Sequence, residues 1–164
     1  MFRPTLYKNR VTEISLDDLK KLGVEALFLD VDNTLSTHHG KEYVEGLQDW
    51  LDLMSASGIK LILTSNSKNE RVEPFAKGLK LDYIAMSLKP LSSGFRKAKR
   101  KLNIDKKKIC VVGDQLFTDV LGAKLYGVKV ILLEPILLED KPSFKFKRKL
   151  ERIIFKIEKI GGKQ

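Results

Sequence analysis

The sequence predicts an α/β protein, a three-layer α/β/α sandwich around a five-stranded, mainly parallel sheet. Short apolar runs alternate along the chain with segments of helical periodicity, which is the order that βαβ units produce. Four of these runs end in polar or charged residues, as strands do at the carboxyl edge of an open parallel sheet. At 164 residues, the chain has the length of one such domain.

The apolar runs give the predicted strands, which are residues 24–29, 59–64, 82–85, 109–112 and 128–133. Helical spacing or helix-end signals predict helices after Ser15, over 44–57, from Ser67, over 91–102 and over 119–126. Ser15 with Asp18, and Ser67 with Glu70, have the spacing of capping boxes. The first of these helices should end at Gly23.

Two acidic residues, Asp30 and Asp32, follow the first strand directly. Burying an unpaired carboxylate is costly, so this end of the strand must supply a counter-charge. A divalent cation is the usual one. A lone D-x-D pattern is weak, however, and most such pairs are turns, so its meaning depends on what the other strands place beside it.

Polar residues also follow the other strands of the predicted sheet. They are Ser65, Asn66, Lys89, Asp114 and Asp119. Because the carboxyl ends of parallel strands meet at one edge, we expect these side chains to lie near the two aspartates. Two simpler interpretations stay open at this point: Ser65 only caps a helix, or Lys89 is an exposed loop lysine. Because Lys89 lies between a predicted strand and a predicted helix, its truncation is expected to remove activity and leave the core intact. His38 and His39 are interpreted as surface or substrate-facing residues rather than metal ligands.

The net charge is +10, and two segments account for more than all of it. Residues 96–108 contain eight Lys and Arg against Asp105, and residues 141–164 contain nine against two glutamates. Such segments favour an anionic partner, which is a phospholipid surface, a nucleic acid or a phosphorylated substrate. Solvated helix faces are the simpler alternative.

The composition of the chain also predicts where in the cell the protein is located. The chain has no uninterrupted apolar run of about 18 residues, the length needed to cross a bilayer, and its first ten residues lack the apolar region of a secretory signal. Its single cysteine, Cys110, lies in an apolar run, where a core residue is expected. These features predict a cytoplasmic protein, with peripheral association at the inner face of the membrane as an option.

Four patterns together resemble the haloacid dehalogenase (HAD) superfamily of phosphatases. Residues 30–34 (DVDNT) resemble its first motif, D-x-D-x-T, and residues 65–66 its second, a Ser or Thr that closes a strand. Lys89 resembles the third, and residues 113–119 (GDQLFTD) the fourth, G-D-x-x-x-x-D. The resemblance covers residues 24–133, and it implies the Rossmann-like HAD fold.

The segments between these motifs are short, which resembles the capless IIIA subclass and leaves no room for a large cap domain. Residues 32–35, the pair Lys89-Pro90 and residues 113–120 are most similar to the YqeG-like family, itself similar to mitochondrial phosphatidylglycerophosphate phosphatases. Residues 1–140 are thus expected to form the phosphatase domain.

The resemblance implies a role for each matching residue. Asp30 would be the nucleophile that forms an aspartyl-phosphate, and Asp32 the general acid and base. Lys89 would neutralise charge on Asp30 and the phosphoryl group. Phosphate oxygens would be bound by Ser65 and the Asn66 amide. Mg²⁺ would be held by Asp30, the backbone carbonyl of Asp32, Asp114 and Asp119.

Residues 141–164 are predicted to add a basic amphipathic helix. Its apolar stripe consists of Phe146, Leu150, Ile153, Ile157 and Ile160. The stripe could lie on an anionic bilayer, on the domain or on a second copy, so the oligomeric state is left open.

The function hypothesis with most support is a phosphomonoesterase at an anionic lipid surface, with phosphatidylglycerophosphate as the leading substrate. The alternatives are a nucleic-acid-associated protein or polynucleotide phosphatase, and a soluble small-molecule phosphatase. Phe95 is the only aromatic residue beside the basic run 96–108, and this argues against a stacking platform for nucleic acid.

Overall fold

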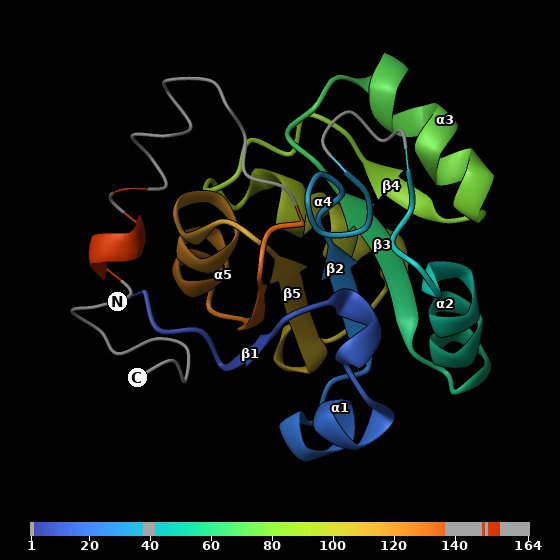
Figure 1. The fold of residues 1–164 in the computed structure, drawn as a ribbon, viewed down its shortest axis with the longest axis horizontal. Coiled ribbons are helices and arrows are strands. Elements are labelled where there is room, and N and C mark those ends of the chain that lie inside the picture. The colour runs from blue at the N-terminus through green and yellow to red at the C-terminus, as the bar shows by residue number, and fades with distance from the viewer. Residues whose placement is uncertain (1, 38–41, 137–148, 150, 155–164) are drawn as a thin grey trace.

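The computed structural model describes residues 2–37, 42–136, 149 and 151–154. Within them, six parallel strands form one sheet in the order β1-β6-β5-β2-β3-β4 (Figure 1). The strands are Leu6–Lys8 (β1), Ala26–Leu29 (β2), Lys60–Thr64 (β3), Asp82–Ile84 (β4), Ile109–Gly113 (β5) and Lys129–Leu133 (β6). The prediction of a parallel α/β sandwich is confirmed.

The prediction of five strands missed β1. This strand lies at the edge of the sheet, where it pairs only with β6. Its three residues, Leu-Tyr-Lys, are all partly exposed, and they contain no apolar run. The pattern that predicts the other strands is therefore absent from β1.

The helices are Leu16–Leu22 (α1), Leu47–Ala56 (α2), Asn69–Leu79 (α3), Ser93–Leu102 (α4) and Leu121–Tyr126 (α5). Three short helical segments lie between strands and helices. They are η1 (Val11–Glu13), η2 (Lys106–Lys108) and the π-helix η3 (Leu116–Val120). The capping box of Ser15 and Asp18 is confirmed. The capping box predicted at Ser67 is wrong, because α3 begins at Asn69 and its N-cap residue is Lys68, with no side-chain capping hydrogen bond.

Both faces of the sheet are covered by helices, as predicted. Alternate residues of each strand point to opposite faces. In β2, Leu27 and Leu29 join one buried cluster with side chains of α1, α2 and α3, while Ala26 and Phe28 join a second with α4 and α5. The strands β2, β3, β5 and β6 are therefore apolar on both sides, which explains their uninterrupted apolar runs.

Cys110 lies in the first of these clusters and is fully buried. Burial raises the pKa of its thiol to about 12, so almost no reactive thiolate forms at neutral pH. We expect the native protein to resist iodoacetamide at pH 7.5, and the denatured chain to take up one equivalent, as counted by mass spectrometry. Rapid labelling of the native protein would contradict this placement.

The register of the central strands aligns their carboxyl ends. Leu29 of β2 lies opposite Leu63 of β3 and Val112 of β5. The chain therefore leaves these strands at the same level, and the polar residues that follow them lie along one edge of the sheet.

Candidate active site

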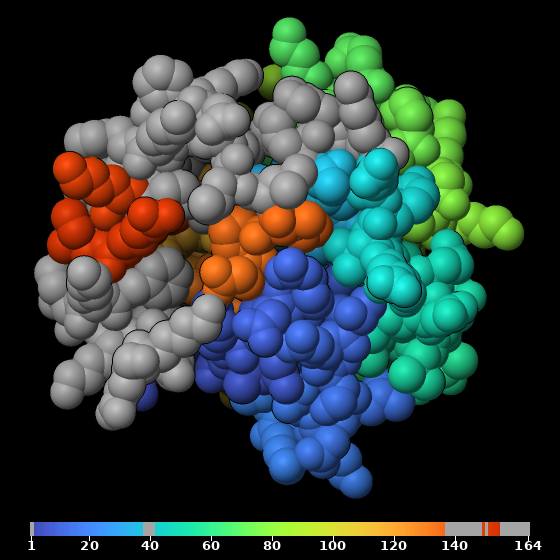
Figure 2. Space-filling view, in the orientation of Figure 1, coloured from blue at the N-terminus to red at the C-terminus, as the bar shows by residue number. Residues whose placement is uncertain are grey.

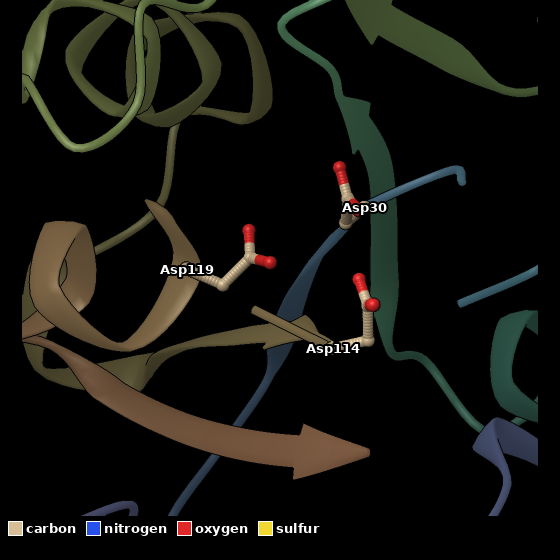
Figure 3. Close-up of side chains that lie close together, drawn as sticks. All are labelled: Asp30, Asp114 and Asp119. Carbon is tan, nitrogen blue, oxygen red and sulfur yellow. The ribbon is translucent and has the colours of Figure 1, made fainter. Parts of the chain in front are cut away.

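Three carboxylates converge at this edge of the sheet. Asp30 follows β2, Asp114 follows β5 and Asp119 lies in η3 (Figure 3). One oxygen of each lies within 4.8 Å of the others, and the residues are 7%, 2% and 0% exposed. The structure thus concentrates negative charge where water screens it poorly.

Lys89 compensates part of this charge. Its Nζ lies 2.6 Å from Oδ1 of Asp30 and 2.7 Å from Oδ1 of Asp119, and its side chain is 2% exposed. Burial alone would lower the pKa of Lys89, but the charges of Asp119 and Asp30 and the hydrogen bonds to them raise it above its usual value. Lys89 is therefore a buried cation, and the alternative of an exposed loop lysine is wrong.

In this cluster, three buried carboxylates lie together with one lysine. Burial raises the pKa of Asp30 well above its usual value; Lys89 opposes this, and Asp119 and Asp114 add to it. A divalent cation would balance the cluster, and carboxylate oxygens are the ligands that Mg²⁺ prefers. The donor set of Asp30, Asp114 and Asp119 fits such an ion.

Asn66 fixes the loop that presents Lys89. Its side-chain oxygen accepts hydrogen bonds from the Lys89 backbone N–H at 2.8 Å and the Ser87 hydroxyl at 2.9 Å, and its Nδ2 donates to the Lys89 carbonyl at 3.0 Å. The side-chain amide of Asn66 is therefore occupied by this loop. A role for Asn66 in phosphate binding stays a prediction.

Ser65 lies at the same edge, directly after β3, and is 2% exposed. Its hydroxyl oxygen accepts a hydrogen bond from the backbone N–H of Ser67 at 3.1 Å. That contact stabilises the turn into α3, but it uses only an acceptor position, and the hydroxyl proton can still be donated to a phosphate oxygen.

The residue before Asp114 is Gly113, and the close packing around it explains why it has no side chain. A Cβ atom at this position would lie 2.3 Å from Cγ of Asp119, far inside contact distance. Asp119 packs directly over this backbone, with its Oδ2 accepting a hydrogen bond from the Gln115 N–H at 3.2 Å. Only glycine allows Asp119 to approach closely enough to reach Lys89.

Asp32 lies apart from this cluster, and its side chain contacts α3 instead. Arg71 donates to its Oδ1, and the Ser67 hydroxyl lies 3.5 Å from its Oδ2. Sequence reasoning missed Arg71. In the sequence, Arg71 lies 39 residues from Asp32, and no local pattern links the two residues.

Glu151 is a second residue that sequence reasoning missed. It is 2% exposed, and its Oε1 accepts a hydrogen bond from the Leu116 N–H at 3.1 Å, at the start of η3. Ile154 packs on the cluster beneath α4 and α5, whereas Ile153 of the predicted stripe is 46% exposed. The other stripe residues, like His38 and His39, lie outside the described residues.

Fold and site together define a hydrolase of the HAD type. A family model described as haloacid dehalogenase-like hydrolase matches residues 11–127. The chain belongs to this family, and it is an enzyme of the phosphatase type. The resemblance found from four short patterns is confirmed.

Two curated proteins are similar over nearly the whole chain. "Probable phosphatase YqeG" of Bacillus subtilis is 32% identical, over 98% of this chain and 94% of its own length. Mitochondrial phosphatidylglycerophosphatase GEP4 of Saccharomyces cerevisiae is 27% identical, over 92% of this chain and 90% of its own. A subfamily III A HAD hydrolase from Legionella pneumophila shares the fold, with a TM-score of 0.55 and 19% identity over 79% of this chain and 73% of that one.

Proposed function

We propose that this protein is a Mg²⁺-dependent phosphomonoesterase that works through an aspartyl-phosphate on Asp30. The observation that supports this most is the position of Lys89, which contacts Asp30 and Asp119 while Asp114 lies within reach of both. A purely structural ion pair would need one carboxylate rather than three. A phosphoryl group needs this combination of a nucleophile and positive charge at one point.

In the first step, a carboxylate oxygen of Asp30 attacks phosphorus while the bond to the leaving oxygen breaks. Asp32 donates its proton to that oxygen, and the alcohol departs. In the second step, Asp32 takes a proton from water, whose oxygen attacks the phosphorus of the aspartyl-phosphate. The bond to Asp30 then breaks, which releases inorganic phosphate and restores the enzyme.

The other site residues position the phosphoryl group. Lys89 and the hydroxyl of Ser65 offer donors to its oxygens, with Asn66 holding the Lys89 loop in place. Mg²⁺ would be held by Asp30, Asp114 and Asp119, with the backbone carbonyl of Asp32 as a further ligand. When bound, it neutralises charge on the phosphoryl oxygens, so that a dianion can approach the carboxylates.

The metal dependence can be measured with p-nitrophenyl phosphate. Release of p-nitrophenol should require Mg²⁺ and stop with EDTA, because the three carboxylates beside Lys89 would otherwise disfavour the approach of a phosphate dianion. Ca²⁺ should support it poorly, since it takes more ligands at longer distances. Turnover that is unchanged by EDTA would contradict a metal at Asp30, Asp114 and Asp119.

The substrate proposed is phosphatidylglycerophosphate, which the name of the yeast relative supports. Among the described residues, no helix has the length and apolar character to cross a bilayer. The second half of the basic run lies away from the site, at the amino edge of the sheet: Lys101 pairs with Asp82 at the start of β4, and Lys108 of η2, which directly precedes β5, pairs with Glu25 at 2.7 Å. This part of the run therefore does not supply substrate contacts for a lipid or for a nucleic acid at the site.

In a cytoplasmic protein, peripheral binding to the inner face of the membrane would then be made by the C-terminal segment. Its described part uses one face, Glu151 and Ile154, for the domain and leaves Ile153 exposed. Figure 1 places residues 151–154 beside α5, at the surface of the molecule. Arg152 and Lys149 are exposed there as well.

A single charge placed on this face tests the idea. Ile153→Glu should weaken binding to anionic vesicles about tenfold, the effect of losing one buried aliphatic side chain, and leave turnover of p-nitrophenyl phosphate intact. The control is Leu53→Glu, at a residue of α2 that is 51% exposed on the other face of the sheet. Equal loss in both variants, or no vesicle binding at low salt, would contradict a membrane contact at residue 153.

A further inference from the structure

Arg71 is a charged residue beside the site to which the phosphatase mechanism gives no task. It lies in the first turn of α3 and contacts Asp32, and its Nη1 donates to the Ser67 hydroxyl at 3.1 Å. The Arg71 and Asp32 side chains are 34% and 17% exposed. The guanidinium is therefore held in place at one end while part of it still faces solvent.

The exposed part of Arg71 lines a pocket of about 320 Å³. Its other polar lining residues are Ser65, Ser67 and Asp32, and its apolar lining residues are Val31, Tyr43, Val72, Pro74 and Phe75. The rings of Tyr43 and Phe75 contact each other edge to face, with their centroids 5.2 Å apart, within the apolar side. Figure 2 shows the segment around residue 43 (cyan) beside α3 (light green) at the surface.

The position of this pocket indicates what it binds. Asp32 must reach the oxygen of the leaving alcohol, and Ser65 lies at the phosphoryl end of the site. Whatever is attached to the leaving oxygen therefore extends past Asp32 into the space that Arg71 and α3 enclose. A volume of this size accommodates a group such as glycerol with one anion attached, while acyl chains would have to lie outside it.

We infer that this pocket binds the leaving alcohol and that Arg71 selects an alcohol bearing its own anion, a phosphodiester or carboxylate a few bonds from the phosphomonoester. A guanidinium binds such groups through two parallel hydrogen bonds. The apolar wall fits the carbon chain between the two anions. The inference rests on the proposed function for the role of Asp32.

The ion pair between Arg71 and Asp32 should also affect the rate of catalysis. Without substrate, Arg71 and Asp32 satisfy each other, which holds the acid–base residue against α3. An anion on the leaving alcohol gives Arg71 a second partner, and Asp32 then becomes available to the leaving oxygen. A neutral alcohol offers no such exchange, so selectivity should appear in kcat as well as in KM.

The first test compares substrates of similar size. Wild-type protein with Mg²⁺ should hydrolyse 3-phosphoglycerate, whose alcohol is anionic, with a kcat/KM about 10- to 100-fold above that for glycerol 3-phosphate, the range of one charge-assisted contact. Arg71→Met should reduce that ratio to about one. Lys77→Met is the control, because it removes a cation of the same helix that pairs with Glu73 instead.

The ratio separates two roles for Arg71. If Arg71 only positions Asp32, Arg71→Met will lower kcat/KM equally for both substrates and leave their ratio unchanged, which would overturn the inference. A wild-type protein without preference for the anionic alcohol would overturn it too. Deacylated and acylated phosphatidylglycerophosphate then distinguish the source: a higher kcat/KM for the acylated form assigns the anion to a lipid, and equal values assign it to a soluble substrate.

A binding measurement keeps this inference distinct from the phosphatase proposal. In Asp30→Asn, which should not turn over, calorimetry should give a lower Kd for 3-phosphoglycerate than for glycerol 3-phosphate, and adding Arg71→Met should remove the difference. If the wild type hydrolyses neither ester but this binding preference is present, the phosphatase mechanism fails and the pocket assignment stands. If the wild type hydrolyses the esters but the binding preference is absent, the phosphatase mechanism stands and the pocket assignment fails.

Discussion

Replacing Asp30 by Asn is expected to lower phosphatase turnover by at least about 10⁴-fold, to the background of the assay. An amide cannot form the acyl phosphate, so the reaction loses its first covalent step rather than a stabilising contact, and loss of a nucleophile has effects of this size in other covalent enzymes. The change keeps the size of the side chain. The measurement is kcat for p-nitrophenyl phosphate at saturating Mg²⁺.

Asp32→Asn gives the comparison that identifies the nucleophile. General acid–base catalysis contributes about 10²–10⁴-fold, so this variant should retain measurable turnover where Asp30→Asn does not. Asp17→Asn is the matched control, because Asp17 is an exposed carboxylate of α1 that pairs with Lys21. If Asp30→Asn keeps turnover near the wild-type value, the aspartyl-phosphate mechanism is wrong.

Two further readouts show whether the loss is chemical. Acid quench with a ³²P-labelled ester should trap a phosphoprotein in the wild type and none in Asp30→Asn. Thermal unfolding in EDTA should show the variant to be at least as stable as the wild type, because burial and the neighbouring carboxylates disfavour the charged form of Asp30. A large fall in Tm would instead indicate that the substitution disrupts the fold.

The sequence was informative about this site because parallel sheets convert strand ends into neighbours. Asp30, Lys89 and the pair Asp114 and Asp119 come from three separate stretches of the chain. Each stretch follows a strand, and the aligned register of β2, β3, β4 and β5 puts the ends of these strands at one level. The core was predictable for the same reason, since a strand buried on both faces has an uninterrupted apolar sequence.

What the sequence did not reveal depends on contacts that leave no periodic pattern. The strand β1 is a partly exposed edge of three residues, and Ser67 turns toward Asp32 instead of capping α3. Arg71 and Glu151 act through single hydrogen bonds to residues 39 and 35 positions away. Such long-range polar contacts are set by the packing of whole elements, which local propensity does not encode.

Lys89→Met should remove activity and also destabilise the protein, which differs from the expectation for a loop lysine. Loss of the cation removes charge stabilisation worth about 10²–10³-fold in kcat, as for one donor to a developing oxyanion. It also leaves Asp30 and Asp119 without their partner in a buried place, and breaking a buried pair in this way costs about 3–5 kcal/mol. Chemical unfolding at pH 7.5 in EDTA measures that loss.

Loss of the Lys89 charge, rather than loss of its side-chain packing, should cause this destabilisation. Two controls distinguish these two causes. Lys101→Met removes a lysine from an exposed pair with Asp82, which should cost at most about 1 kcal/mol. Mg²⁺ should restore much of the stability of Lys89→Met, since the ion supplies charge to the same carboxylates. A loss that Mg²⁺ does not reduce at all would point to packing.

The free energy of unfolding of Lys89→Met should also depend on pH in a way that reports the charge of Asp30. Burial raises the pKa of Asp30 and Lys89 opposes that rise, so without Lys89 the folded protein should keep a proton on Asp30 to a higher pH than the unfolded chain does. A group whose pKa is raised by folding stabilises the native state in acid, and this contribution is lost as the pH rises through the raised pKa. In EDTA, the difference in unfolding free energy between wild type and variant should therefore be smaller at pH 5 than at pH 8. Equal differences at the two pH values would mean that Lys89 supports the fold through its methylene chain and not through its charge.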